Sequence, residues 1–359
     1  MKILFCHLLN NYTGSPKVLS QELALLSSKS DYKISLLTSK TDGILSNLQN
    51  VSIYDNKYRW SNNHFLLAGL FLFAQIYSFF FVFFHNYDVV YINTLVPFGA
   101  AIAAKVRHKK IIYHIHEVYI KTGLLKRFYT KIMEICADRV ICVSEYVREN
   151  NPSVMDRSCV IYNPIEYHKM RVNLEEYLQK KFNNKLIFMP TSLKEYKGVY
   201  QFIGLARMLP DFKFRLLCST SLEDMNIYFS NIALPENLEL IGKHNNIFEF
   251  YKEATITVNM SLPDKWIETF GLTIVESFDT YTPVVAPAYG GPKEIITDGE
   301  NGFLVNPYKF DQITLAINKI MKNFTVYKHF SLEAKRNIEK YDVNQFLEKI
   351  SNIIREVVK

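Results

Sequence analysis

The feature that most constrains the fold is an alternation of short apolar segments with helical segments, which runs twice along the 359-residue chain. Helical stretches such as 16–28 and 98–106 separate the apolar segments of the first series. Apolar strands that alternate with helices predict parallel βαβ units. The strand-like segments of the first series are Lys2–Cys6, Lys33–Thr38, Asp88–Ile92, Lys110–Ile115, Arg139–Val143 and Val160–Tyr162.

The alternation begins again after a polar stretch at residues 166–184. Single hydrophobic cores stop growing at roughly 250–300 residues, so the length also favours two domains. The sequence therefore predicts two α/β domains with a boundary near 164–184, and two facing sheets would bind a ligand in the cleft between them. The strand-like segments of the second series are Leu186–Pro190, Phe212–Cys218, Leu238–Ile241, Ile256–Met260, Pro283–Ala286 and Gly302–Val305.

The net charge of +7 lies entirely in the first half of the chain. Residues 1–163 carry 18 basic and 11 acidic residues, whereas the remainder carries 24 of each. This asymmetry predicts an anionic partner for the first half. No helix-turn-helix, zinc or RNA-binding signature is present, so a membrane surface is favoured over nucleic acid. The five cysteines form no CxxC pair, which fits a reducing compartment without a disulfide framework or zinc site.

An uncharged stretch at residues 65–84, FLLAGLFLFAQIYSFFFVFF, would form a helix about 30 Å long, enough to span a bilayer. A crossing would, however, separate strands that we expect in one sheet. Three alternatives remain: a spanning helix, a buried crossover helix, and a crossover helix that also enters the membrane surface. Basic residues nearby favour contact with an anionic leaflet, although a solvated helix face gives the same pattern: Lys105, Arg107, Lys109, Lys110, Lys121, Lys126, Arg127 and Lys131.

The segment ETFGLTIVES holds Glu268 and Glu276 on either side of a predicted helix start at Gly271. The free N–H groups of such a start, from Phe270 to Thr273, and the positive end of the helix dipole favour a diphosphate. A flanking carboxylate can accept hydrogen bonds from ribose or sugar hydroxyls. Taken alone, the same pair could be a capping residue and a solvent-facing helical residue.

Two further segments give this pair its context. TSLKEYKG follows an apolar strand and places Lys194 and Lys197 at a strand-to-helix turn, where a phosphate would lie. AYGGPKEIITDGENGFLVNP lies downstream and contains the turn Gly290-Gly291. The order and spacing of the three segments are specific in a way that none of them is alone.

In these segments the chain resembles the retaining glycosyltransferases of the GT-B fold, many of which build bacterial surface polysaccharides. The resemblance covers nearly the full length and is densest from 186 to 307. It implies two Rossmann-like domains that face a cleft. Residues 1–163, rejoined by a final helix at 342–359, would bind the acceptor, and residues 164–341 would bind the nucleotide sugar.

The resemblance also implies roles for single residues of the second domain. Glu276 would bind the nucleotide ribose, Glu268 would lie by the donor sugar, and Lys197 matches the family lysine on the diphosphate. Ser192 stands where the family has an arginine, so Lys194 is expected to substitute as a point charge in place of a planar fork.

In the first domain, NNYTGSPKVL resembles the glycine-rich loop near the donor phosphates, with Gly14 but no Gly-Gly pair. HIHE resembles the His-acidic element, with His116 as the better match and His114 as the second choice. The expected catalytic residues are therefore His116 and Glu268. The expected donor-binding residues are Gly14, Lys194, Lys197, Phe270, Gly271, Leu272 and Glu276.

The implied reaction moves a sugar from a nucleotide-diphosphate sugar to a lipid-linked saccharide, with retention, in capsule or O-antigen synthesis at the inner face of the cell membrane. No cofactor beyond the donor is expected. Asp264 and Asp298 are isolated and form no DxD-like pair, so metal independence is predicted. Alternatives are a non-catalytic sugar-nucleotide-binding or scaffold subunit, a nucleotide-sugar epimerase, and a nicotinamide oxidoreductase. The last is disfavoured because no G-x-G-x-x-G follows a strand.

Overall fold

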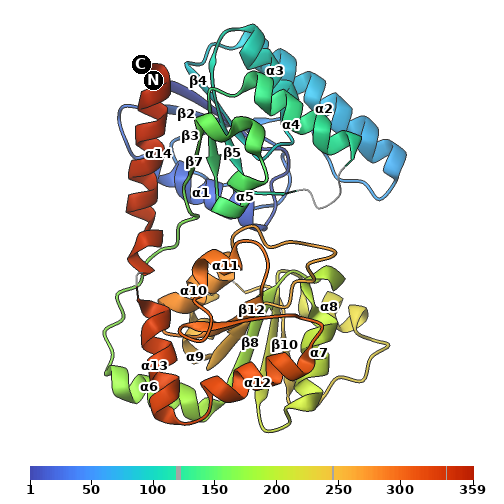
Figure 1. Cartoon of the computed structure of the whole chain (residues 1–359). Coiled ribbons are helices and arrows are strands. Elements are labelled where there is room, and N and C mark those ends of the chain that lie inside the picture. Colours follow the sequence, from blue (N-terminus) through green and yellow to red (C-terminus); the bar gives the residue numbers. More distant parts are fainter. Residues whose placement is uncertain (119–122, 245, 337) are drawn as a thin grey trace. The chain divides into compact units, whose positions relative to one another are not determined.

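The computed structural model describes residues 1–118, 123–244, 246–336 and 338–359. It divides into two compact units (Figure 1). The first consists of Met1–Pro164 together with Val343–Lys359, and the second of Ile165–Asp342. The sequence places these boundaries one residue earlier, at 163/164 and 341/342.

The first unit is built on a seven-stranded sheet in the order β3-β2-β1-β4-β5-β6-β7, and every neighbouring pair is parallel. The sequence misses β3, because this short strand at the sheet edge is half exposed and carries polar residues. The strands are β1 (Lys2–Cys6), β2 (Lys33–Thr38), β3 (Val51–Asp55), β4 (Val89–Asn93), β5 (Lys110–Ile115), β6 (Arg139–Cys142) and β7 (Ser158–Val160).

Helices cover both faces of this sheet. The last helix of the chain, α14, packs beside α1, and its Phe346, Ile350 and Ile354 belong to the same core as Val18 and Leu23. Figure 1 shows α2, α3 and α4 together on the side of the sheet away from α14. The helices are α1 (Gly14–Leu26), α2 (His64–Phe84), α3 (Phe98–Val106), α4 (Leu124–Cys136), α5 (Glu145–Glu149) and α14 (Val343–Val358), with a 3-10 turn at Pro152–Arg157.

The second unit repeats the pattern with a six-stranded parallel sheet in the order β10-β9-β8-β11-β12-β13. The two parallel α/β units confirm the predicted fold class, and the predicted strands lie within two residues of the observed ones. The strands are β8 (Leu186–Thr191), β9 (Lys213–Cys218), β10 (Leu238–Ile241), β11 (Ile256–Val258), β12 (Val284–Pro287) and β13 (Gly302–Val305).

Helices again cover this second sheet. The polar stretch expected between the domains contains α6, whose Leu178 and Lys181 are buried, so it belongs to the second unit. The helices are α6 (Leu174–Asn184), α7 (Val199–Met208), α8 (Leu222–Tyr228), α9 (Phe248–Glu253), α10 (Leu272–Asp279), α11 (Pro292–Ile295), α12 (Phe310–Ile320) and α13 (Phe324–Lys335). Two 3-10 turns lie at Glu195–Lys197 and Ile338–Tyr341.

The structure decides one of the alternatives for the apolar stretch. Helix α2 is long and apolar enough to cross a membrane, but it joins β3 to β4, and both strands lie in the same sheet. A membrane crossing would place these two strands on opposite sides of a bilayer. Moreover, α2 buries the polar side chains of Gln75 and Ser78. The helix is therefore a crossover helix that is only partly covered by protein.

Helices α2 and α3 approach each other at Gly99. The Gln75 side chain accepts a hydrogen bond from the Gly99 N–H at 3.0 Å. A Cβ atom at position 99 would lie 2.1 Å from the Gln75 carbonyl oxygen, which is backbone and cannot swing aside. The glycine is thus required by the helix crossing.

We expect Gly99→Ala to lower the free energy of unfolding by about 2 kcal/mol, because the helices must separate to admit the methyl group. Gly69→Ala is the matched control, since Gly69 lies in α2 with open space where the Cβ would be. That change should be neutral or stabilising by up to about 1 kcal/mol. Urea unfolding followed by circular dichroism measures both, and equal effects of the two variants would contradict the proposed crossing.

Candidate active site

Three of the segments singled out by the sequence meet in the second unit. TSLKEYKG follows β8, the loop with Glu268 follows β11, and the Gly290-Gly291 turn follows β12. Strands β8, β11 and β12 are consecutive neighbours in one parallel sheet. Their carboxyl ends therefore lie side by side, at the edge where open α/β sheets bind ligands.

The first contact between these loops is an ion pair. Lys197 Nζ lies 2.9 Å from Glu268 Oε2, and both side chains are largely covered. The same ammonium lies 5.2 Å from the centre of the Trp266 ring, which stacks on Tyr196. The pair joins the residue predicted to hold the diphosphate to the one predicted to lie by the sugar.

Glycines allow the backbones of these loops to touch. Gly198 has a φ of +77°, and a Cβ there would lie 2.0 Å from the Met260 carbonyl oxygen. A Cβ at Gly291 would lie 2.4 Å from the Phe270 Cα, and the Gly291 N–H donates to the Glu268 carbonyl at 2.9 Å. The sequence treats Gly290-Gly291 as a turn; the structure shows that it also supports the Glu268 loop.

Helix α10 begins as predicted, directly after Gly271, whose φ of +104° is left-handed. The first N–H groups of a helix have no acceptor within the helix, so Leu272 and Thr273 present donors at this end. Phe270 is buried and packs against Tyr341 with ring centres 5.8 Å apart. Its side chain therefore supports the loop from behind.

Glu276 lies one turn into α10 and accepts a hydrogen bond from the Tyr251 hydroxyl at 2.8 Å. No local sequence pattern indicates Tyr251, because its contact with Glu276 joins residues that are 25 positions apart. Tyr251 is fully buried, so it holds the carboxylate in one orientation.

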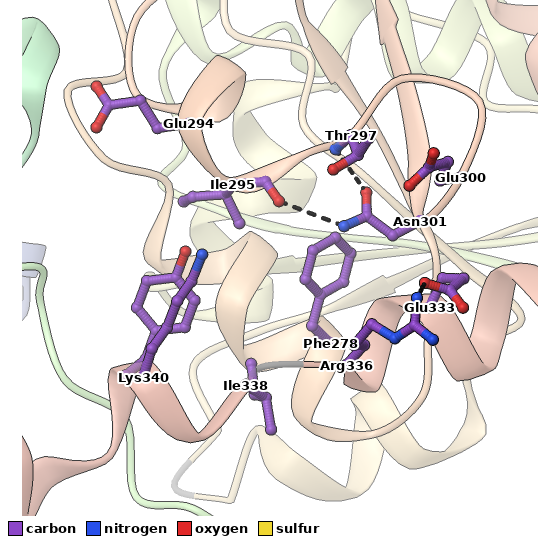
Figure 2. Close-up of a pocket in the computed structure, with 11 residues that line it drawn as sticks. Phe278, Glu294, Ile295, Thr297, Glu300, Asn301, Glu333, Arg336, Ile338 and Lys340 are labelled. Atoms are coloured by element: carbon purple, nitrogen blue, oxygen red, sulfur yellow. Dashed lines mark hydrogen bonds and ion pairs between the residues drawn. The ribbon is translucent and has the colours of Figure 1, made fainter.

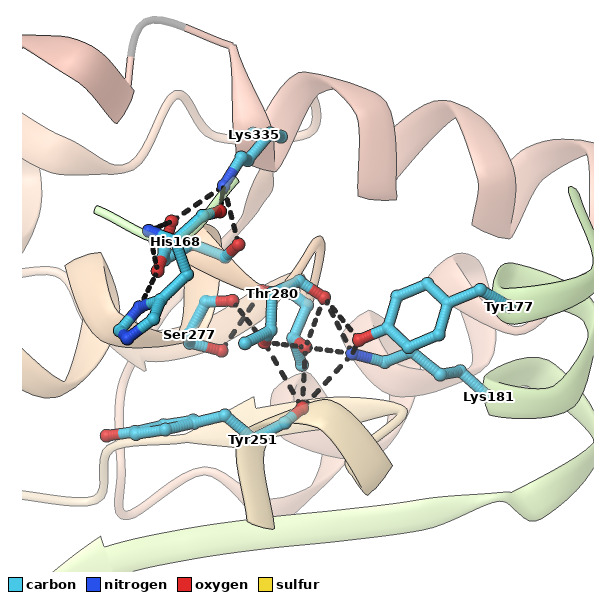
Figure 3. A network of polar contacts seen from close by, with 9 residues as sticks. His168, Tyr177, Lys181, Tyr251, Ser277, Thr280 and Lys335 are labelled. Carbon is cyan, nitrogen blue, oxygen red and sulfur yellow. Dashed lines mark hydrogen bonds and ion pairs between the residues drawn. The ribbon is translucent and has the colours of Figure 1, made fainter. Parts of the chain in front are cut away.

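Behind this tyrosine lies a buried polar network around Lys181 (Figure 3). Lys181 Nζ donates to the carbonyl oxygens of Tyr251 at 3.1 Å and Thr280 at 2.8 Å, and to the hydroxyl of Thr282. Burial lowers the pKa of Lys181 well below its usual value. The lysine thus ties α6 to the residue that orients Glu276 and to the end of α10.

The end of α10 is held by charge as well. The buried Asp279 accepts from Lys335 Nζ at 2.6 Å and from His168 Nδ1 at 2.8 Å (Figure 3). Lys335 comes from α13. Helix α10 is therefore fixed at its carboxyl end while its amino end faces the loops.

Lys194 is exposed on the loop after β8, and Ser192 is partly buried on the same loop. The role of Lys194 in place of the family arginine stays a prediction. No group of three or more His, Cys, Asp or Glu side chains that could hold a metal ion occurs among the described residues.

A polar pocket of about 270 Å³ lies in the same unit (Figure 2). Its walls come from α10, α11, the loop before β13 and the end of α13, and they include Phe278, Glu294, Asn301, Arg336 and Lys340. The predicted donor-binding residues do not line it. The residues predicted to bind the donor therefore lie in the loop cluster at the strand ends and not in this pocket.

The first unit brings the histidine motif into a polar chain at the end of β5. His116 Nε2 lies 2.9 Å from Asn93 Oδ1, and Asn93 Nδ2 lies 2.9 Å from His7 Nδ1. His114, the second choice, is fully buried, with its Nδ1 2.9 Å from the Tyr91 hydroxyl. His114 is therefore a core residue, and His116 is the better candidate for substrate contact.

Burial also sets the charge of this cluster. Desolvation, with the nearby His114 and His7, lowers the pKa of His116 well below its usual value, so the ring is neutral at pH 7. Burial raises the pKa of Glu117 to about 7, although the N–H groups of Leu95 and His116 donate to its carboxylate. Gly14, by contrast, is exposed at the first turn of α1 with open space around it.

Comparison with known families places two models in tandem on the chain. Residues 173–337 match the model described as glycosyl transferases group 1. Residues 19–169 match the model described as glycosyltransferase family 4. The two matches cover most of both structural units.

Two curated proteins illustrate the similarity. An uncharacterized glycosyltransferase of Methanocaldococcus jannaschii is 24% identical over 284 residues, which are 75% of this chain and 76% of that protein. A poly(glycerol-phosphate) alpha-glucosyltransferase of Bacillus subtilis is 25% identical over 183 residues, which are 50% of this chain. The match spans only 27% of the Bacillus protein's own length.

Solved structures share the fold over the whole chain. HepE of Anabaena in complex with UDP and glucose has a TM-score of 0.78 at 20% identity, with 99% of each chain covered. WaaG, a glycosyltransferase involved in lipopolysaccharide biosynthesis, has a TM-score of 0.74 at 14% identity, with 98% of this chain and 99% of that chain covered. The fold is therefore GT-B.

We expect Lys181→Met to lower the free energy of unfolding by roughly 2–4 kcal/mol. Methionine has a similar volume but removes the ammonium donor from the buried carbonyl groups of Tyr251 and Thr280, which then keep only hydroxyl donors. Lys180→Met is the control, because Lys180 is the exposed neighbour on the same helix. Denaturant unfolding compares the two, and equal midpoints would contradict a stabilising role for Lys181.

Burial lowers the pKa of His7 from 6.5 to about 4, which predicts a pH dependence of stability. Below pH 6.5 the unfolded chain binds a proton that the folded chain does not bind until about pH 4. A fall from pH 7.5 to 5 should therefore cost about 2 kcal/mol of stability through this residue. His7→Gln keeps an acceptor for Asn93 but cannot titrate, so its stability should fall less over this range. Equal pH dependence of the two proteins in urea unfolding would contradict the assignment.

Proposed function

The chain belongs to the group 1 glycosyltransferases, retaining enzymes of the GT-B fold and here of the hexosyltransferase type, and we propose that its donor is a UDP-sugar. Support for the base comes from HepE, which has been solved with UDP and with UDP-glucose. The observation that carries the proposal is the loop cluster of the second unit. It gathers a helix start, a lysine and two carboxylates at the ends of three neighbouring strands.

In this proposal the diphosphate binds at the amino end of α10. The N–H groups of Leu272 and Thr273 and the helix dipole would stabilise the negative charge that grows as the bond to the sugar breaks. Lys197 would turn from Glu268 to the phosphates, with Lys194 as a second cation. These groups supply the charge that the leaving diphosphate requires from the protein.

The two carboxylates would take different partners. Glu276, oriented by Tyr251, would accept hydrogen bonds from the two ribose hydroxyls. Glu268 loses its lysine partner when the donor binds, and its carboxylate then becomes an acceptor for hydroxyl groups of the donor sugar. The ion pair seen here is in this view a resting arrangement that the diphosphate replaces.

His116 belongs to the other unit, and its role toward the sugar is inferred from the family motif. If its Nε2 donates to Asn93 Oδ1, its Nδ1 is the unprotonated acceptor. A neutral ring of this kind can accept a hydrogen bond from a sugar hydroxyl at pH 7.

For the acceptor we propose a lipid-linked saccharide in the synthesis of a bacterial surface polysaccharide, at the inner face of the cell membrane. The names of the relatives support this: the Bacillus protein acts on poly(glycerol-phosphate), and WaaG is involved in lipopolysaccharide biosynthesis. Transfer would proceed with retention and without a metal ion.

The donor site predicts ligand-specific stabilisation. Among UDP, GDP, ADP, CMP and NAD, we expect only UDP to raise the melting temperature, by the equivalent of about 2.7 kcal/mol at a hundred times its Kd. Glu276→Ala should weaken UDP binding roughly 10- to 100-fold, because charged hydrogen bonds contribute about 1.5–3 kcal/mol. Glu236→Ala, an exposed glutamate of the same unit, is the control and should bind UDP normally.

Other outcomes favour the alternatives. A melting temperature that no nucleotide changes would favour a scaffold subunit, and a response to NAD alone would favour an oxidoreductase. Incubation with UDP-sugars, with and without saccharide acceptors, then separates a transferase from an epimerase. A change of the donor sugar without any acceptor would overturn the proposed transfer.

A further inference from the structure

We propose that the first unit docks on an anionic lipid bilayer through an exposed apolar surface, which we call the aromatic face. This docking proposal does not rest on the proposed reaction, because it concerns only α2, α3 and α4. The aromatic face consists of Phe65, Leu66, Leu72, Phe73, Ile76, Phe80 and Phe84 of α2 with Leu124, Leu125 and Phe128 of α4, all of which are exposed.

On α2 the exposed residues form one continuous stripe. Phe65, Leu72, Ile76, Phe80 and Phe84 recur every three or four positions once Gly69 is included, so they share one side of the helix. The stripe runs along about 28 Å of helix. Phe65 is 92% exposed and Phe84 75% exposed, which is unusual for side chains whose burial is worth about 1.5–3 kcal/mol each.

The opposite side of α2 is fixed to the protein. Ala74, Gln75, Ser78, Phe81 and Val82 are buried, and Gln75 accepts the hydrogen bond from the Gly99 N–H on α3. The stripe is therefore presented by an anchored helix. Since β3 and β4 lie in one sheet, the helix can enter a bilayer surface only while lying along it.

Ring contacts connect this stripe to the exposed residues of α4. Phe98 of α3 lies between the two helices, with its ring centre 6.1 Å from that of Phe71 and 5.1 Å from that of Phe128. Leu124 and Leu125 at the start of α4 are 83% and 60% exposed. The two helices thus contribute to a shared surface of the first unit, on the side shown in Figure 1 away from α14.

Basic groups flank the apolar residues. The Arg107 guanidinium lies 5.5 Å from the Phe83 ring centre, and Lys109 Nζ donates to Asn86 at 2.6 Å, so both lie beside the carboxyl end of α2. Lys126 and Arg127 follow Leu124 and Leu125 on α4. Residues 61–137 contain eight Lys and Arg but three Asp and Glu; Lys121, one of the eight, lies outside the described residues.

The basic side chains around the aromatic face favour an anionic bilayer over a second copy of the chain as its partner. Two copies of the chain that met through this face would bring like charges together, which disfavours self-association. An anionic bilayer instead offers hydrocarbon for the phenylalanines and phosphate groups for the basic side chains, each worth about 1 kcal/mol near such a surface. Trp60, 65% exposed just before α2, is of a type enriched at the membrane interface.

The test is co-sedimentation with vesicles of phosphatidylcholine, with and without phosphatidylglycerol, in the absence of any donor or acceptor. We expect the wild-type protein to bind the anionic vesicles at least ten-fold more strongly than the neutral ones. High salt should weaken this binding, because it screens the charges. The triple variant Phe65→Ser, Phe80→Ser, Phe84→Ser and the double variant Lys126→Gln, Arg127→Gln should each lose at least ten-fold in affinity.

The control removes exposed apolar residues elsewhere: Met208→Ser, Ile227→Ser and Leu315→Ser, all in the second unit. It should bind vesicles like the wild type. Equal binding of neutral and anionic vesicles, no binding to either, or equal losses in the control and the triple variant would overturn the proposal. So would a wild-type dimer in solution that the triple variant converts to monomer. Unchanged circular dichroism and melting temperature establish that the variants are folded.

Discussion

The candidate donor site depends on the close approach of three loops at the carboxyl ends of β8, β11 and β12. At Gly198 and Gly291 the backbone of one loop meets the backbone of the next at distances that leave no room for a side chain. This contact brings Lys197 within 2.9 Å of Glu268. Parallel strands produce the arrangement, because their carboxyl ends meet at a single edge of the sheet. The glycines then decide how closely the loops that follow can pack.

The orientation of α10 is the second requirement, and buried polar groups meet it. Asp279 at its carboxyl end is held by Lys335 and His168, and Lys181 binds the carbonyl groups behind Tyr251. Such groups are costly to bury unless every partner is present, so the network favours one geometry over its neighbours. A helix start that is to bind a diphosphate has to be fixed in this way before the ligand arrives.

The first unit has the same kind of fold as the second but carries different residues at its strand ends and on its outer helices. At the carboxyl ends of its central strands, polar contacts join His116, Asn93 and His7, and desolvation keeps both histidine rings neutral. On the outer side of this unit, by contrast, helix α2 exposes a stripe of phenylalanines to solvent. The sheet requires neither the histidine chain nor the exposed stripe, since a crossover helix needs only to cover the strands beneath it. The exposed phenylalanines of α2 therefore make this helix a candidate for contact with an apolar environment outside the protein.

The sequence by itself determined the fold class, because alternating apolar and helical segments are a local pattern that allows few other solutions. It also indicated the three segments of the candidate donor site and the start of α10 at Gly271. It missed β3, whose half-exposed residues lack an apolar pattern, and Tyr251, whose link to Glu276 joins residues far apart in the chain. Only the tertiary structure showed that His114 is fully buried in the core, since burial depends on what packs over a strand end. It also settled α2 as a crossover helix, because strand pairing between β1, β2, β3 and β4 joins residues that no local pattern relates.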